Sequence, residues 1–367
     1  MRITAAVTEE KGAPFRLQEL ELGELRPDEV LVKVAAAGIC HTDLICRDQW
    51  YPVPLPAVLG HEGAGVVEQV GSAVTRVAAG DRVGMSFHSC GACPTCQTGR
   101  PSYCHAFFEH NFASARPADG SSVLSRDGQP IHAHFFGQSS FASHAVANQR
   151  NVVKLDSQIP LEIVAPFGCG IQTGAGAVLN TLRAPAGSTL AVFGTGAVGL
   201  SAVLAGVIAG CTTIVGVDVN PERLALAREL GATHTIDGRD LDAVEEIRRI
   251  TGTGVDFSLE TTASPRVFRQ AVESTGPTGV CGLIGAPAFG TEVSLDMNSI
   301  LVAGRTVRGI VEGDSVPDVF LPRLVRLWEQ GRFPVERLMK HYDFDRIEEA
   351  VADAESGRVI KPVLRMH

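Results

Sequence analysis

The sequence carries little charge, and it has no excess of basic residues. Charged residues make up 20% of the 367 residues, and 41 aspartates and glutamates outnumber 32 lysines and arginines, which gives a net charge of −9 at pH 7. A protein that binds nucleic acid needs a basic face for the phosphates, so we expect no such partner. The 45% of hydrophobic residues is typical of an ordinary folded protein.

Apolar targeting or membrane segments are also lacking. Met1 to Gly12 carries charges and no apolar core, which argues against a signal peptide. Residues 190–217 hold no charged residue and are long enough to span a membrane, but six glycines interrupt them. A buried parallel strand, a helix and a second strand explain this stretch better. We therefore expect a cytoplasmic protein without a membrane partner.

The length is about twice that of a typical domain, and the sequence pattern changes along the chain. The first part should be β-rich, with strands at 30–34 and 65–70, followed by a long loop at 97–137. Later, strands alternate with helices, which predicts a doubly wound parallel sheet. We expect strands at 189–193, 213–217, 255–259 and 280–284, helices at 198–209, 221–230 and 266–274, then helices at 319–330 and 346–355 and a strand at 360–364.

Four of the nine cysteines form the strongest local motif: Cys90, Cys93, Cys96 and Cys104. An odd number of cysteines and no signal peptide favour metal binding over disulfides. Four thiolates can close a tetrahedron around zinc and leave no open position, so a lobe at about 88–106 should be structural. Free cysteines, two disulfides or an iron–sulfur cluster are the alternatives.

A glycine motif marks a second candidate site. Gly194, Gly196 and Gly199 follow an expected strand and open an expected helix, and Asp218 comes nineteen positions after Gly199. In this context the glycines let the backbone approach a pyrophosphate, and the acidic residue binds the ribose. Because a 2′-phosphate would be repelled by Asp218, the motif favours NAD over NADP. A glycine-rich turn without a ligand is the alternative.

A third set of residues is dispersed: Cys40, His61 and Cys169. A catalytic zinc needs three protein ligands and an open fourth position. From spacing alone this set is a weak indication, because each residue could equally be a buried cysteine or a histidine that is hydrogen-bonded in the core.

The order of these motifs resembles the zinc-dependent medium-chain alcohol dehydrogenases over essentially the whole chain. Residues 60–65 (GHEGAG), the cysteine lobe and the glycine loop follow in the order of that family. Residues 40–49 and 136–142 look most like aryl-alcohol (benzyl-alcohol type) dehydrogenases. The resemblance implies an α/β fold with a Rossmann-type coenzyme domain and a β-rich GroES-like catalytic domain, and a homodimer or homotetramer. The coenzyme domain would span 171–311, and the catalytic domain 1–170 and 312–367.

The resemblance also implies roles for single residues. Cys40, His61 and Cys169 would hold the catalytic zinc, and Glu62 would lie beside the metal and exchange with a ligand. Thr42 would take the alcohol proton, and Asp43 would orient the imidazole of His61. The implied cofactor contacts are His41 and Lys361 at the pyrophosphate, Thr173 and Val198 at the nicotinamide, Gly194, Gly196 and Gly199 in the glycine loop, and Asp218, Asn220 and Arg223 at the adenosine ribose. Arg223 and Lys361 could instead be ordinary surface charges.

One position departs from the family. Better-studied members have a histidine three positions after the proton-accepting hydroxyl, as the outer end of a proton relay. Ile45 occupies this position here and cannot carry a proton, so the proton would leave through water or through another group such as His41.

The expected function is NAD-linked oxidation of a primary alcohol, aryl or allylic, to the aldehyde and the reverse, with two zinc ions per chain. Aromatic side chains would line the pocket, although each could be plain core: Trp50, Phe87, Phe112 and Phe141. The alternatives are a terpenoid allylic alcohol dehydrogenase and a glutathione-linked formaldehyde dehydrogenase, which would want a basic pocket. A zinc-free quinone reductase would not need the cysteines. A zinc-ribbon binding module is the alternative from another class, and the nucleotide motif disfavours it.

Overall fold

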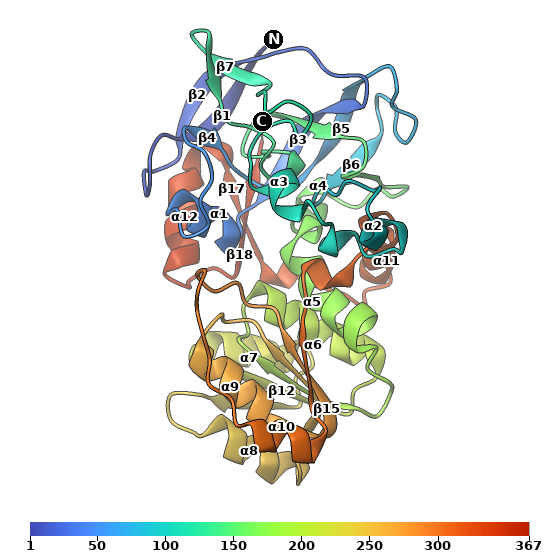
Figure 1. The fold of residues 1–367 in the computed structure, drawn as a ribbon, viewed down its shortest axis with the longest axis vertical. Helices are drawn as coiled ribbons and strands as arrows, with labels where there is room; N and C mark the ends of the chain where they lie inside the picture. The colour runs from blue at the N-terminus through green and yellow to red at the C-terminus, as the bar shows by residue number, and fades with distance from the viewer. Residues whose placement is uncertain (367) are drawn as a thin grey trace. The chain divides into compact units, whose positions relative to one another are not determined.

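The structure is a computed structural model that describes residues 1–366. It divides into two compact units, and both ends of the chain contribute to the first. The first unit consists of Met1–Cys169 and the segment from Val316 onward, and the second of Gly170–Ser315 (Figure 1).

The first unit is built on two largely antiparallel sheets. Its strands are β1 (Arg2–Thr8), β2 (Arg16–Leu22), β3 (Glu29–Gly38), β4 (Ala57–Val58), β5 (Glu62–Val70), β6 (Arg82–Met85), β7 (Leu124–Arg126), β8 (Gln129–Ile131), β9 (His144–Asn148), β10 (Val152–Lys154), β17 (Met339–Asp343) and β18 (Lys361–Arg365). The orders are β4-β1-β2-β7-β8 and β10-β6-β5-β3-β18-β17, with β9 also paired to β3. Because β18 pairs antiparallel with β3, the last strand of the chain is part of the sheet that carries its first half.

Short helices connect these strands. They are α1 (His41–Arg47), α2 (Pro94–Gln97), α3 (Phe107–Asn111), α4 (Leu161–Val164), α11 (Pro317–Glu329) and α12 (Ile347–Glu355), with single 3₁₀ turns η1 (Pro101–Tyr103), η2 (Phe135–Gly137), η3 (Ala165–Gly168), η6 (Val335–Leu338) and η7 (Phe344–Arg346). Helix α1 begins after Cys40, whose N–H donates to the carboxylate of Asp43 at 2.9 Å. The start of this helix thus holds four of the predicted site residues, Cys40, His41, Thr42 and Asp43.

The expectation of one long loop at 97–137 was wrong, because this stretch contains η1, α3 and the β7–β8 hairpin. Asp127 and Gly128 have φ values of 52° and 75°, and Asp-Gly favours such two-residue hairpin turns. The two strands have three residues each, which is too short for an alternating pattern to be visible in the sequence.

The second unit confirms the predicted parallel sheet. Its strands are β11 (Thr189–Phe193), β12 (Thr213–Asp218), β13 (His234–Asp237), β14 (Val255–Glu260), β15 (Thr275–Leu283) and β16 (Thr306–Gly309), and its helices are α5 (Gly170–Gly176), α6 (Ala197–Ala209), α7 (Pro221–Glu229), α8 (Ala243–Thr251), α9 (Pro265–Ser274) and α10 (Met297–Ala303), with a π turn η4 (Ala177–Leu182) and a 3₁₀ turn η5 (Glu312–Asp314). All five strand pairings are parallel, in the order β13-β12-β11-β14-β15-β16. This is the order of a doubly wound dinucleotide-binding sheet, whose ligands bind at the carboxyl ends of the strands.

The uncharged stretch at 190–217 forms most of β11, all of α6 and most of β12. Within residues 1–366, no helix is both long enough and apolar enough to cross a membrane.

Candidate active site

Cys40, His61, Glu62 and Cys169 lie together in the first unit, with one potential ligand atom from each within 4.8 Å of the others. They come from distant parts of the sequence: the start of α1, the start of β5 and the end of η3. A hydrogen bond with Cys169 lowers the pKa of the Cys40 thiol well below its ordinary value, although burial opposes this change. A thiolate is the form in which cysteine binds metal.

The imidazole of His61 is oriented by a carboxylate. Its Nδ1 lies 2.7 Å from Asp43 Oδ1, which also accepts from the N–H of Gly60 at 3.2 Å. Both side chains are fully buried. When Nδ1–H donates to a carboxylate, Nε2 keeps its lone pair for a metal. Nε2 is buried and has no hydrogen-bond partner among residues 1–366, and a buried polar atom of this kind requires an explanation. A bound zinc ion would explain it, because two cysteine sulfurs lie nearby.

Cys169 is brought to the cluster by a close approach of two backbones. The carbonyl of Gly168 accepts a hydrogen bond from Ser86 Oγ at 2.7 Å. A Cβ at Gly168 would lie 2.1 Å from the carbonyl oxygen of Met85. Only glycine therefore allows the end of η3 to lie this close to the end of β6.

Glu62 is held in a buried ion pair. Lys361 Nζ on β18 donates to Oε1 and Oε2 of Glu62 at 3.0 and 2.9 Å, and to the carbonyl of Ile39 at 3.1 Å. Burial by itself would lower the pKa of the Lys361 ammonium, but the charge of Glu62 raises it above its ordinary value. The carboxylate thus stays beside the thiolates with its charge balanced by a cation.

Two aromatic rings that the sequence analysis did not single out contact His61. Phe136 stacks on the imidazole with 4.5 Å between ring centroids, and Phe135 meets it edge-on at 5.6 Å. Phe136 adopts the left-handed conformation (φ 50°, ψ 33°), which is uncommon for a bulky residue. The only signal in the sequence was the resemblance of residues 136–142 to aryl-alcohol dehydrogenases.

The second cluster is Cys90, Cys93, Cys96 and Cys104, whose sulfurs also lie within 4.8 Å of one another. The sulfurs of Cys90 and Cys96 are 3.9 Å apart, far beyond the roughly 2.05 Å of a disulfide. Backbone N–H groups of Ala92 and Cys93 donate to the sulfur of Cys90 at 3.4 and 3.3 Å. Thr95 and backbone donors lower the pKa of the Cys93 thiol to about 5. The lobe thus offers four sulfur donors and fits a closed zinc site.

The glycine loop joins β11 to α6 in the second unit. Gly194 has a φ of 90°, and a Cβ there would lie 2.5 Å from Thr261 Oγ1. A Cβ at Gly199 would lie 1.8 Å from the carbonyl oxygen of Gly194. At Gly196, in contrast, a Cβ would meet no atom within 4 Å. Packing therefore requires glycine at positions 194 and 199. Gly196 instead leaves open space at the N-terminus of α6, which no side chain caps, and an anion can bind there.

Asp218 ends β12 and fixes the loop around it. Its Oδ2 accepts from the backbone and hydroxyl of Thr195 at 2.6 and 2.9 Å, and its Oδ1 from the backbone of Val219 and Asn220 at 2.7 and 2.9 Å. The side chain of Asn220 caps α7 by accepting from two backbone N–H groups. Arg223 has a buried Nε without a hydrogen-bond partner.

Both family models that match the chain describe alcohol-dehydrogenase-type domains. Residues 26–157 match the alcohol dehydrogenase GroES-like domain, and residues 197–328 match the zinc-binding dehydrogenase domain. A geraniol dehydrogenase from Castellaniella defragrans is 46% identical over 361 residues, which is 98% of this chain and 96% of the relative. The chain belongs to the zinc-dependent medium-chain alcohol dehydrogenases.

Two solved structures share the fold of this alcohol dehydrogenase. An alcohol dehydrogenase zinc-binding domain protein from Burkholderia ambifaria is 54% identical, with a TM-score of 0.98 over 100% of this chain and 99% of the other. Benzyl alcohol dehydrogenase from Acinetobacter calcoaceticus is 47% identical, with a TM-score of 0.97 over 100% of both chains. The likeness thus extends over the whole chain.

Other predicted residues of this alcohol dehydrogenase lie outside the two clusters. Thr42 Oγ1 is 3.8 Å from the sulfur of Cys40, and His41 beside it is exposed. Thr173 on α5 donates to Glu312 at 3.4 Å. It lies on a helix that touches α6, because a Cβ at Gly174 would be 1.9 Å from the carbonyl oxygen of Val198.

The four predicted pocket aromatics do not form one group. Phe141 is fully buried and packs edge-on against Phe15 in the core of the first unit, with 5.5 Å between centroids. Phe87 is buried as well, whereas Trp50 is 58% exposed. Phe112 contacts both rings beside His61, Phe135 at 6.0 Å and Phe136 at 5.1 Å. Of the four, Phe112 is therefore the one in direct contact with the rings beside His61, and Phe87 is linked to Phe136 only through Phe107.

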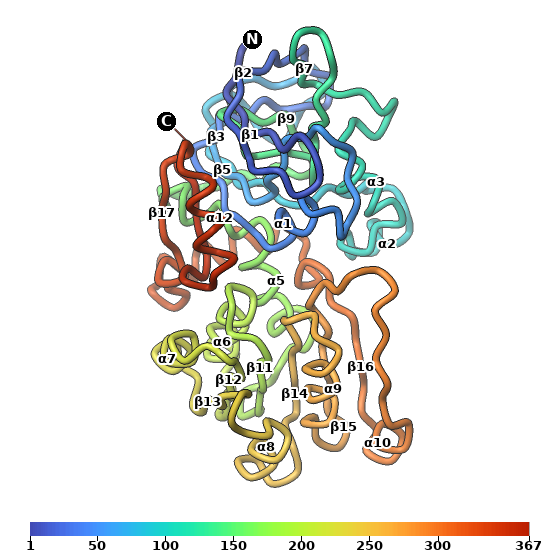
Figure 2. Tube along the Cα trace, turned by 90° about the vertical axis from the view of Figure 1, so that its left-hand side faces the viewer, coloured from blue at the N-terminus to red at the C-terminus, as the bar shows by residue number. Residues whose placement is uncertain are grey.

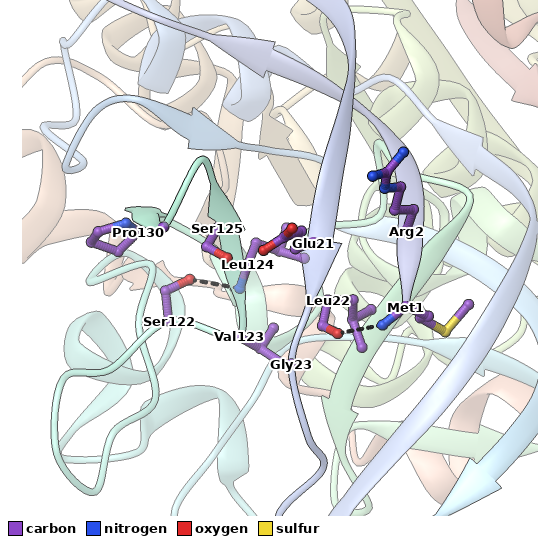
Figure 3. Close-up of a pocket in the computed structure, with 11 residues that line it drawn as sticks. Met1, Arg2, Glu21, Leu22, Gly23, Ser122, Val123, Leu124, Ser125 and Pro130 are labelled. Atoms are coloured by element: carbon purple, nitrogen blue, oxygen red, sulfur yellow. Dashed lines mark hydrogen bonds between the residues drawn. The ribbon is translucent and has the colours of Figure 1, made fainter.

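A groove of about 540 Å³ lies between β1, β2 and the β7 hairpin. It is bordered by the N-terminal ammonium of Met1, which donates to the carbonyl of Leu22, and by the Ser122 segment (Figure 3). Its lining contains none of the predicted site residues, so it has no part in the argument for function.

Proposed function

We propose that this enzyme oxidises planar aryl or allylic primary alcohols to aldehydes with NAD, and catalyses the reverse reaction. The observation that carries the proposal is the close set of two cysteine sulfurs and one buried imidazole nitrogen that has no hydrogen-bond partner within the described part of the chain. The names of two relatives, geraniol dehydrogenase and benzyl alcohol dehydrogenase, support an allylic or aryl primary alcohol as substrate.

The residues of the proposed site have separate tasks. Cys40, His61 and Cys169 would hold a catalytic zinc, with Glu62 close enough to exchange with a ligand. Zinc bound there would supply Lewis acidity for the alcohol oxygen, and bound NAD would supply the hydride acceptor. Thr42, next to the ligand Cys40, would accept the alcohol proton.

Substrate shape would be recognised by an aromatic wall rather than by polar groups, with Phe112 as its accessible ring, because Phe135 and Phe136 are 0% and 4% exposed. Phe112, Phe135 and Phe136 contact one another with centroid distances of 5.0 to 6.0 Å. Offset and edge-on contacts with such rings favour flat, apolar ligands. This argument suits benzylic, cinnamyl and terpenoid allylic alcohols better than short aliphatic ones.

Cofactor preference would come from Asp218, with Asn220 and Arg223 nearby on the first turn of α7. The open space at Gly196 supports a pyrophosphate there, with His41 and Lys361 proposed as basic contacts and Thr173 and Val198 as contacts of the nicotinamide. The domains would be those given by the sequence: 171–311 for the coenzyme, and 1–170 with 312–367 for catalysis.

We also propose that the enzyme is a cytoplasmic homo-oligomer that associates through α10 and β16. Met297, Leu301 and Val302 on α10 are 84%, 77% and 85% exposed. Contiguous exposed apolar side chains mark interaction sites. The helix lies beside β16, the last strand of the parallel sheet, at one edge of the second unit (Figure 2), and sheet edges are common sites of pairing between chains.

A turnover screen with purified enzyme tests the proposal. Benzyl, cinnamyl, terpenoid and short aliphatic alcohols are offered with NAD and with NADP, while zinc is quantified per chain. We expect about two zinc ions, the highest kcat/KM with aryl or allylic alcohols, and a preference for NAD. Highest efficiency with short aliphatic alcohols, or equal use of both cofactors, would contradict the proposed specificity.

A further inference from the structure

Three backbone groups from two segments near the proposed metal ligands bond to one side chain, that of Gln138. Its Oε1 accepts from the N–H of Gly63 at 3.0 Å, and its Nε2 donates to the carbonyl of His61 at 2.8 Å. The same Nε2 donates to the carbonyl of Ser86 at 3.3 Å. Gln138 is 1% exposed, so bulk water has almost no access to replace these bonds.

Ser86 extends the connection to another ligand. Its hydroxyl donates to the carbonyl of Gly168 at 2.7 Å, directly before Cys169. His61 and Cys169 are 108 positions apart, and the amide of Gln138 and the hydroxyl of Ser86 connect the backbone of His61 to that of Gly168 by hydrogen bonds.

The turn that carries Gln138 also contacts the ring of His61. Phe136, two positions earlier, stacks on the imidazole from a left-handed backbone conformation. A bulky residue holds this conformation only when its surroundings enforce it. The turn thus contacts His61 in two ways: the ring of Phe136 stacks on its imidazole, and the amide of Gln138 donates to its backbone carbonyl.

We propose that Gln138 is a positioning residue for the catalytic metal. Its amide fixes the backbone of His61 and, through Ser86, the backbone beside Cys169. The two ligands are thereby held at the distance from each other that the metal requires. Glutamine suits this place because one side chain must accept from one backbone group and donate to two others. The inference rests on the proposed function only in taking Cys40, His61 and Cys169 as zinc ligands.

The test measures metal binding rather than turnover. Gln138→Met keeps the length of the side chain and removes all three hydrogen bonds, while Gln138→Glu keeps an acceptor for Gly63 and loses the donor to His61. Loss of groups that orient metal ligands typically weakens metal affinity by about 10–100-fold. We expect both variants to bind one of the two zinc ions about 10–100-fold more weakly than the unmodified enzyme does. Competition with a chelator measures this zinc affinity. We also expect cobalt, used in place of zinc at the more labile site, to show altered d–d absorption bands.

Ser139→Ala is the matched control in the same turn. Ser139 Oγ donates to the carbonyl of Val58 at 2.6 Å and accepts from the N–H of Phe135 at 2.9 Å. Ser139 is buried, and both of these bonds go to backbone groups of residues that are not proposed metal ligands. This variant should lower the melting temperature and leave zinc affinity and the cobalt spectrum unchanged.

The proposal is overturned if Gln138→Met binds zinc and cobalt like the unmodified enzyme while its melting temperature falls as in Ser139→Ala. If Gln138→Met does not fold, Gln138→Glu and Gln138→Asn decide by the same measurements. A zinc-loaded, unmodified enzyme that oxidises no alcohol would refute the proposed function and leave this inference standing, because metal affinity is measured independently of turnover.

Discussion

At the scale of single residues, the chemistry depends on charges that folding has removed from water. The ion pair of Glu62 and Lys361 is almost completely buried, with side chains 0% and 3% exposed. A buried pair adds little net stability compared with two apolar residues, but an uncompensated partner is costly. The pair therefore places the carboxylate of Glu62 beside the cysteine sulfurs with a cation in contact, and each partner requires the other.

Removing one partner should lower the free energy of unfolding much more than removing both. Lys361→Met leaves a buried carboxylate without its cation, and we expect the free energy of unfolding to fall by about 3–5 kcal/mol. Adding Glu62→Gln should recover most of this loss, which urea unfolding of the single and double variants will measure. Additive effects of the two substitutions would show that the pair is not coupled.

Ile45 bears on how the proton of the alcohol reaches solvent, a second point at the scale of single residues. The side chain is 3% exposed, and it stands where an imidazole would end the relay from Thr42. General-base assistance typically contributes about 10²–10⁴-fold when proton transfer limits the rate. Burial would lower the pKa of an imidazole placed here, so the unprotonated base would persist below its ordinary pKa of about 6.5.

We therefore expect Ile45→His to raise kcat for alcohol oxidation mainly at the acidic end of a series from pH 6 to 10. Ile45→Gln is the control, since it is polar and does not titrate in this range. Unchanged profiles, with a substrate whose deuterium isotope effect shows that chemistry limits the rate, would mean that another proton exit already suffices.

At the scale of elements, the two cysteine-bearing segments should behave differently. The lobe offers four sulfurs, while the cluster of Cys40, His61 and Cys169 has as its fourth member Glu62, whose carboxylate is bonded to Lys361. Metal at a closed site contributes directly to folding. Cys96→Ser should thus lower the melting temperature first, and Cys169→Ser should abolish turnover in a folded protein with about one zinc per chain. Complete loss of activity in Cys96→Ser at unchanged thermal stability would refute this division.

The carboxyl end of β12 permits a prediction about the cofactor. Asp218→Ala removes the proposed ribose acceptor and the anchor of Thr195 in the glycine loop. KM for NAD should rise sharply, and NADP should improve relative to NAD. Thr195→Val is the control, because it removes only the hydroxyl donor at 2.9 Å. It should raise KM for NAD less and leave the preference between the cofactors intact.

The elements also show how much of the fold and of the site can be predicted from the sequence. Strands buried on both faces, such as β11 and β12, have long apolar runs and were predicted within a residue at each end. The hairpin β7–β8 was missed because three-residue strands leave no periodic signal. Phe136 and Gln138 were missed for another reason: their contacts with His61 connect positions about 75 apart, and no local pattern encodes such a contact.

At the scale of the whole molecule, the remaining question is how chains associate. The exposed apolar side chains of α10 lie next to a sheet edge, where Thr306 and Val307 of β16 are also exposed. A monomer would leave this surface in water at a cost of roughly 25 cal/mol per Å² of apolar area. A second copy of the chain could cover it with the same surface, as a two-fold interface requires.

Leu301→Glu with Val302→Glu should therefore shift the enzyme from oligomer to monomer. Two carboxylates on each chain would have to be desolvated next to those of the partner, and such like-charge contacts cost several kcal/mol. Sedimentation at several protein concentrations measures the change, with Leu241→Glu as control, because Leu241 is also exposed but lies outside α10 and β16. An unmodified enzyme that sediments as a monomer would refute the predicted oligomer. A variant that stays fully associated, or a control that dissociates equally, would show that the chains meet on another surface.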